Sequence, residues 1–170
     1  LSHRSFEEVF DAARTHSAAL VVMGWGPHSP GRAESTLDEL TGEVPCDFLV
    51  LKDRGFDPSR ILVPTAGGPD SELSASVARL LTDEFGGEVT LLHCLFDDES
   101  REDGQRFLAQ WASDHGLDDA ERIVTEGDVE TAIEREARDH TMLVLGATER
   151  GLLSRLLRGS LVMDVVDDVE

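Results

Sequence analysis

The segment 142–160, "MLVLGATERGLLSRLLRGS", contains the residue types that could bind an anionic ligand. It begins as an apolar run, and Gly146 allows a sharp turn where that run ends. Gly159 allows the backbone to approach a ligand closely, and Ser160 is a suitable N-cap for a following helix. Because free amides and the positive end of the dipole meet at a helix N-terminus, this spacing predicts a phosphate-type site.

Three arginines, Arg150, Arg155 and Arg158, place positive charge in the same segment of a strongly acidic chain. Their guanidinium groups would add cationic partners for phosphate oxygens. The alternative is that Arg155 and Arg158 lie on a short amphipathic segment, where leucines pack inward and the arginines pair with nearby carboxylates. For the arginines alone we favour this alternative, whereas the Gly159-Ser160 pair favours the anion site.

The binding residues must be positioned by the ends of strands. In an open α/β sheet, ligands bind beyond the carboxyl ends of the strands, at the point where the strand order reverses. Segments 65–68, 94–97 and 146–160 follow three expected strands and so meet at that rim. The candidate nucleotide-binding residues are Thr65, Ala66, Cys94, Gly146, Arg150, Gly151, Gly159 and Ser160.

Short, continuous apolar runs predict strands that are buried on both faces, as in a parallel sheet. These runs are residues 20–24, 48–51, 61–66, 89–95 and 142–147, with a weaker one at 122–126. Helical periodicity is found between them, at residues 71–85, 105–115 and 128–140. We therefore expect a doubly wound α/β fold, in which Ile61, Val89 and Met142 begin neighbouring parallel strands.

The chain also contains a partial internal repeat. Residues 6–24 resemble residues 129–146, with Phe10 matching Ile133 and Gly24 matching Gly146. Both copies read as a helix followed by a buried strand that ends in glycine. We interpret residues 1–55 as the C-terminal half of a first unit and residues 56–170 as a second unit lacking its last strand.

Charge composition limits the partners of this chain. It has 35 acidic and 15 basic residues, a formal net charge of -20 and one lysine, Lys52. Such a surface fits a salt-adapted protein, because the Debye length falls to about 3 Å at 1 M salt. An acidic face for a basic partner is the alternative. Either way, the charge disfavours binding to nucleic acid or to an anionic membrane surface.

Cysteine and apolar patterns indicate the compartment. Cys46 and Cys94 are isolated and are expected to be buried thiols in a reducing compartment. No apolar run approaches the roughly 20 residues that cross a bilayer, so we expect a soluble chain without direct membrane insertion. The chain begins at Leu1, which suggests a processed or excised piece.

No catalytic set is evident. His93, beside Cys94 in an expected strand, is predicted to be a core histidine with satisfied hydrogen bonds. The acidic run 97–103, "DDESRED", is predicted to be a solvated loop, because it lacks the spacing of a calcium site. No serine or cysteine nucleophile has a suitable base nearby, so we expect no enzyme and no metal site.

The strands "ILVPTAGG" and "VTLLHCL" and the loop "LGATERGLLSRLLRGS", in this order, resemble the universal stress protein family. The resemblance covers residues 57–170 well and residues 1–55 more loosely. It implies a five-stranded parallel sheet of the adenine-nucleotide alpha-hydrolase-like architecture and a homo-oligomer.

ATP-binding members of that family have a final loop of Gly, two residues, Gly, nine residues and Gly-Ser. Gly146 and the Gly159-Ser160 pair fit this pattern, but Glu149 occupies the middle position, where Gly151 could serve in a shifted register. A carboxylate about 4 Å from a phosphate charge would be repelled by about 4 kcal/mol at an effective dielectric constant of 20. Ala66 stands where such members usually have aspartate.

The loop also resembles stress-type domains that follow the membrane portion of archaeal amino-acid permeases. This resemblance implies a regulatory tail on a membrane transporter portion of the same parent chain. Two functions follow as expectations. The first is a non-catalytic cytoplasmic regulatory or stress-response module, and the alternative is a domain that binds ATP or AMP with magnesium at the loop 146–160.

Overall fold

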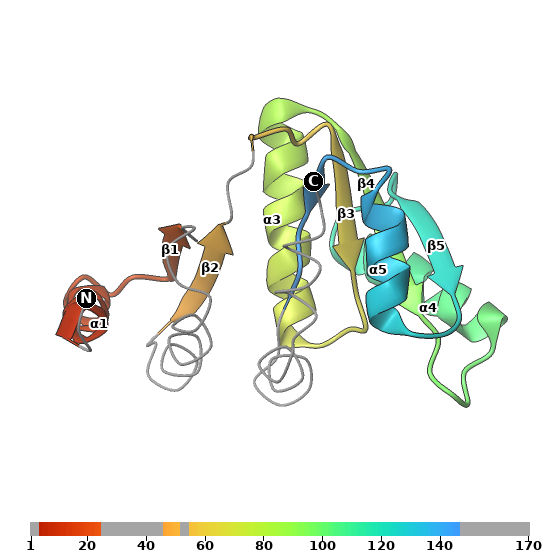
Figure 1. Ribbon diagram of the computed structural model, residues 1–170, viewed down its shortest axis with the longest axis horizontal. Helices are drawn as coiled ribbons and strands as arrows, with labels where there is room; N and C mark the ends of the chain where they lie inside the picture. Colours follow the sequence, from red (N-terminus) through yellow and green to blue (C-terminus); the bar gives the residue numbers. More distant parts are fainter. Residues whose placement is uncertain (1–3, 25–45, 52–54, 147–170) are drawn as a thin grey trace. The chain divides into compact units, whose positions relative to one another are not determined.

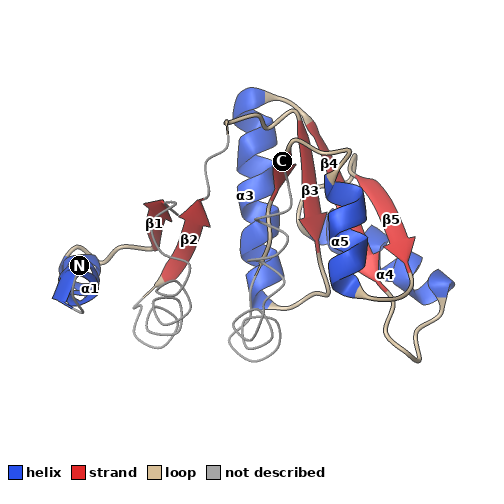
Figure 2. Ribbon diagram, viewed as in Figure 1, coloured by secondary structure: helices blue, strands red, loops and turns tan. Residues whose placement is uncertain are grey.

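The computed structural model describes residues 4–24, 46–51 and 55–146. The chain divides into two compact units, Leu1–Gly55 and Phe56–Glu170, and each is described by itself. Figures 1 and 2 show the helices and strands of both units. The loop and short helix expected at residues 26–43 lie outside the described residues. The assignment of the units as partial copies stays a prediction.

Unit one contains one helix and a two-stranded parallel sheet. Its elements are α1 (Arg4–Thr15), β1 (Leu20–Gly24) and β2 (Asp47–Leu51). The two strands pair in parallel, from Leu20 opposite Asp47 to Gly24 opposite Leu51. The predicted strands at 20–24 and 48–51 are therefore confirmed. Phe10 of α1 is 2% exposed, like its repeat partner Ile133 at 1%.

Unit two contains a parallel sheet in the order β5-β4-β3-β6. Its strands are β3 (Arg60–Pro64), β4 (Glu88–Cys94), β5 (Glu121–Thr125) and β6 (Met142–Leu143). Ile61 lies opposite Val89 on one side and Met142 on the other, in parallel register. This arrangement confirms the predicted doubly wound α/β fold. Four strands are described here, and a fifth strand stays a prediction.

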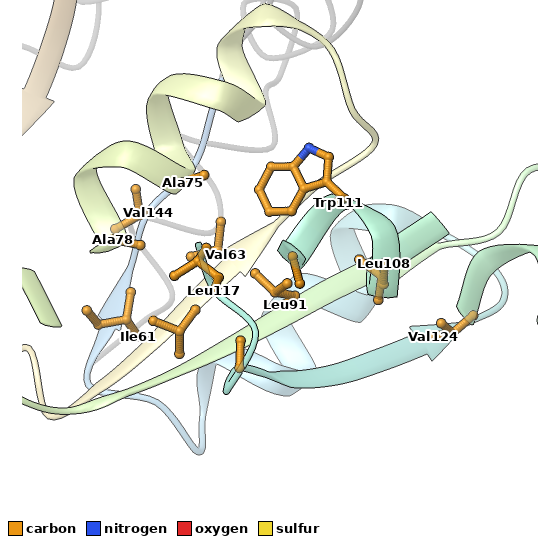
Figure 3. Packing of buried hydrophobic residues seen from close by; sticks show 13 residues of the cluster. Ile61, Val63, Ala75, Ala78, Leu91, Leu108, Trp111, Leu117, Val124 and Val144 are labelled. Atoms are coloured by element: carbon orange, nitrogen blue, oxygen red, sulfur yellow. The ribbon is translucent and has the colours of Figure 1, made fainter. Parts of the chain in front are cut away.

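Helices cover both faces of this sheet. They are α3 (Pro69–Phe85), α4 (Arg101–Asp114) and α5 (Val129–Ala137). On one face, Val63 and Leu91 pack with Ala75 of α3 and Trp111 of α4, as Figure 3 shows. Leu62 points to the other face, because side chains alternate along a strand, and it is also fully buried. The continuous apolar runs of the sequence reflect this double cover.

Helix caps explain where α4 and α5 begin. The predicted N-cap Asp128 accepts a hydrogen bond from the Thr131 amide at 2.9 Å. Ser100 caps α4 in the same way, accepting from the Asp103 amide at 3.2 Å. The helix therefore starts at Arg101, and the prediction of a solvated loop through residue 103 was wrong for its last three residues. Acidic side chains in a first helical turn are favoured by the helix dipole.

The structure gives no candidate for a membrane span: within residues 4–24, 46–51 and 55–146, no helix is both long enough and apolar enough.

Candidate functional site

The candidate site lies at the carboxyl ends of β3, β4 and β6. The strand order reverses at β3, because β4 lies on one side of it and β6 on the other. Thr65 and Ala66 follow β3, Cys94 ends β4, and Gly146 follows β6. The topology thus brings these four predicted residues to one rim, where open α/β sheets bind ligands. Glu149 and the other four candidates (Arg150, Gly151, Gly159, Ser160) lie outside the described residues.

The loop after β3 has a fixed backbone. The amide of Thr65 donates to the carbonyl oxygen of Leu92 at 2.9 Å. The Thr65 hydroxyl oxygen accepts from the Gly67 amide at 3.1 Å, and the Ser71 hydroxyl donates to the Gly67 carbonyl at 3.1 Å. Gly67 has φ +78°, a left-handed conformation that glycine adopts without strain. Ala66 is exposed in this loop, so it offers a methyl group and no acceptor.

A buried histidine connects two loops of the rim. His93 is 1% exposed, and its Nδ1 lies 3.0 Å from the Thr65 carbonyl oxygen. Its Nε2 lies 2.9 Å from Oε2 of Glu99, which also accepts from the Phe96 amide at 3.2 Å. The hydrogen bond from His93 holds the pKa of Glu99 below its ordinary value. The prediction of a satisfied core histidine is confirmed.

Glu99, the partner of His93, was not predicted from the sequence. Its only local signal is a carboxylate six positions after a buried histidine, inside a run of acidic residues. Nothing in that run separates Glu99 from Asp97, Asp98 or Glu102 by type. The distinction arises only when the turn before Ser100 brings one side chain back over the end of β4.

The two cysteines are free thiols of intermediate exposure. This corrects the expectation that both are buried: Cys94 is the last residue of β4, and Cys46 immediately precedes β2. Burial raises the pKa of the Cys94 thiol, and the opposing effect of Arg135 is smaller. Cys94 is therefore protonated near neutral pH and is a poor nucleophile.

Two arginines donate hydrogen bonds to residues at the carboxyl end of β5. Arg101 donates to the Val124 carbonyl oxygen at 2.8 Å, and Arg135 donates to the Thr125 hydroxyl at 3.1 Å. Both side chains thus fix the end of a strand. No cluster of three or more potential metal ligands exists within residues 4–24, 46–51 and 55–146.

Comparisons with known proteins agree with this fold. The family model for the universal stress protein family matches residues 58–170. A universal stress protein from Archaeoglobus fulgidus superposes with a TM-score of 0.65 and 16% identity, covering 95% of this chain and 61% of that one. Universal stress protein UspA from Lactobacillus plantarum superposes with a TM-score of 0.50 and 19% identity, covering 66% of this chain and 93% of that one. At these identities the structural likeness shows the fold alone. A comparison with curated proteins finds no match.

Proposed function

Because this chain belongs to the universal stress protein family, we propose that it is a non-catalytic regulatory module of the stress-response type. One observation supports this proposal above others. The polar side chains of the described rim bond to one another and to the backbone: His93 bonds to Glu99, Arg101 to Val124 and Arg135 to Thr125. Such bonds favour a rigid binding edge over a set of reactive groups.

In this role the module lies in the cytoplasm as the soluble tail of an amino-acid transporter, and it self-associates. The resemblance of residues 146–160 to permease-linked domains supports the transporter. Two apolar side chains of β1 are exposed, Leu20 at 40% and Val22 at 57%, and they support self-association through this strand.

The coding sequence upstream of Leu1 tests the transporter link. We expect it to encode about ten or more apolar segments of about 20 residues each, the length that crosses a bilayer. An upstream reading frame without such segments would contradict the transporter and leave the regulatory module in place.

The second candidate function is binding of ATP or AMP at the same rim. Two features favour it: the strand order reverses at β3, and the loop after β3 contains the left-handed glycines Gly67 and Gly68. Backbone amides in such loops approach phosphate groups closely. Magnesium would arrive with the nucleotide phosphates, since the described residues provide no cluster of metal ligands.

Restoring a carboxylate after β3 tests this second function. We expect Ala66→Asp to bind ATP about five- to tenfold more tightly, because it supplies an acceptor for a ribose or adenine donor. Isothermal titration calorimetry with ATP and magnesium in molar salt measures the change. Ala109→Asp, at an exposed alanine on α4, is the control for added charge and is expected to match the unmodified chain. Equal affinities for both variants, or no heat at millimolar ATP, would contradict a nucleotide site here.

A further inference from the structure

The contacts of the His93–Glu99 pair call for one more proton than a neutral imidazole beside a carboxylate would have. Nδ1 faces the carbonyl oxygen of Thr65 at 3.0 Å, and a carbonyl only accepts, so Nδ1 carries hydrogen. Nε2 faces Oε2 of Glu99 at 2.9 Å. That oxygen already accepts from the Phe96 amide. A carboxylate needs a donor at Nε2 as well, so the geometry corresponds to an imidazolium.

The surroundings of the imidazole favour a charge-balanced pair. The ring packs against Phe107 and Phe96, with centroids 4.7 and 5.8 Å away. Gly104 of α4 lies against it, since a Cβ there would be 3.3 Å from His93 Cδ2. The β3–α3 loop presents the Thr65 carbonyl, and β5 presents the apolar Val124 beside Gly104.

Within the described part of the chain, one charged group besides His93 shifts the pKa of Glu99. Asp103 in the first turn of α4 raises the pKa of Glu99, but the hydrogen bond from His93 lowers it more. Glu99 itself is 17% exposed at its side chain, against 2% for His93. A buried charge of this kind is tolerated when its partner is adjacent and hydrogen-bonded.

We propose that Glu99 is a positioning residue for the candidate binding rim: through protonated His93 it holds the β4–α4 loop against the end of β3, and the connection is lost when the pair releases its proton. The Thr65 carbonyl, to which His93 is hydrogen-bonded, lies one residue before Ala66 in the loop that contributes to this rim. The effect on ligand rests on the proposed function, whereas the connection itself is a property of the chain without ligand.

The pH dependence has two limits. When the pair loses its additional proton in alkaline solution, Nε2 presents a lone pair to the carboxylate in place of a hydrogen. As pH falls, Glu99 stays ionised below its ordinary range, because its pKa is lowered, and the ion pair is lost only when pH passes through that lowered value. Between these limits the two loops are held together.

Glu99→Gln removes the carboxylate charge that holds the additional proton on His93, while it keeps an acceptor for the Phe96 amide. The glutamine oxygen can occupy the position of Oε2, where it accepts from the Phe96 amide and from Nε2–H of a neutral imidazole, so no additional proton is needed. Nδ1 then has no hydrogen to donate to the Thr65 carbonyl. The full chain is labelled with ¹⁵N, and the ring nitrogens of His93 are observed together with hydrogen exchange of the Phe96 amide. Glu102→Gln is the matched control, because it removes the same charge from a side chain on α4 that is 87% exposed.

In the unmodified chain and in Glu102→Gln, we expect both ring nitrogens to carry hydrogen at about pH 6. The protection factor of Phe96, corrected for intrinsic exchange, should fall about tenfold by about pH 9. In Glu99→Gln we expect one ring hydrogen and a protection factor that is independent of pH over this range. One ring hydrogen in the unmodified chain at about pH 6, or identical pH profiles for the chain and Glu99→Gln, would overturn the proposal.

ATP titration of the same samples separates the two proposals. If the chain binds ATP, its affinity should fall at least about threefold by about pH 9 while that of Glu99→Gln stays constant. If no sample binds ATP, the nucleotide function is wrong, and the ring spectra still decide the role of Glu99. If ATP binds and the spectra show a neutral ring, the nucleotide function stands and the role of Glu99 is refuted.

Discussion

Gly87→Ala is expected to lower the free energy of unfolding by about 3 to 5 kcal/mol. Gly87 has φ +119°, which an L side chain rarely adopts, and a Cβ there would lie 2.3 Å from the Pro58 carbonyl oxygen. The neighbouring backbone cannot shift freely, because the Ser59 carbonyl accepts from the Glu88 amide at 2.9 Å where β3 and β4 begin. Urea unfolding followed by circular dichroism, in constant high salt, measures the change.

Gly127→Ala is the matched control for Gly87. It shares a positive φ, +100°, but nothing lies within 4 Å of a Cβ at that position. Only the backbone strain remains, so we expect a loss of about 1 to 2 kcal/mol. If both variants lose the same free energy of unfolding, the close approach of a Cβ at position 87 to the Pro58 carbonyl oxygen does not destabilise the fold.

Leu91→Ala should destabilise unit two by about 3 to 4 kcal/mol. Leu91 is fully buried on β4, between β3 and β5, in the cluster that includes Leu108 and Trp111. Neighbours on two other strands and a helix restrict collapse into the space left behind, so a cavity adds to the lost burial. The midpoint and slope of urea unfolding report the change.

An exposed leucine provides the control for Leu91. Leu80 on α3 is 62% exposed, and alanine favours the helix at least as well as leucine. We expect Leu80→Ala to change stability by no more than about 0.5 kcal/mol. A loss at Leu91 no larger than that at Leu80 would show that the cluster does not stabilise the sheet.

Much of the fold could be predicted because buried parallel strands leave a strong pattern. The run at residues 20–24 coincides with β1, and the runs beginning at 61, 89 and 142 begin in the three paired strands. The strand predicted at 142–147 was too long, because β6 ends at Leu143. Boundaries set by one capping side chain were harder. The first turn of α4 contains no apolar residue, so periodicity could not find it before Ser100 was seen to cap it.

The candidate site was predictable only in part. Strand order placed Thr65, Ala66, Cys94 and Gly146 at one rim, since parallel strands end on the same side of a sheet. The role of Glu99 depends on a contact between loops that no local pattern encodes. Positions 149–151 and 159–160 of the glycine-containing loop stay predictions because they lie outside the described residues.

The burial of His93 separates two environmental sensitivities of this chain. Mobile ions act on the exposed carboxylates that give the net charge of -20, but they do not enter the packed space around the imidazole. A change in salinity would therefore alter the overall resistance to unfolding while leaving the two loops joined. A change in pH acts on the two loops joined by the His93–Glu99 pair, whereas a change in salt concentration acts on the surface carboxylates.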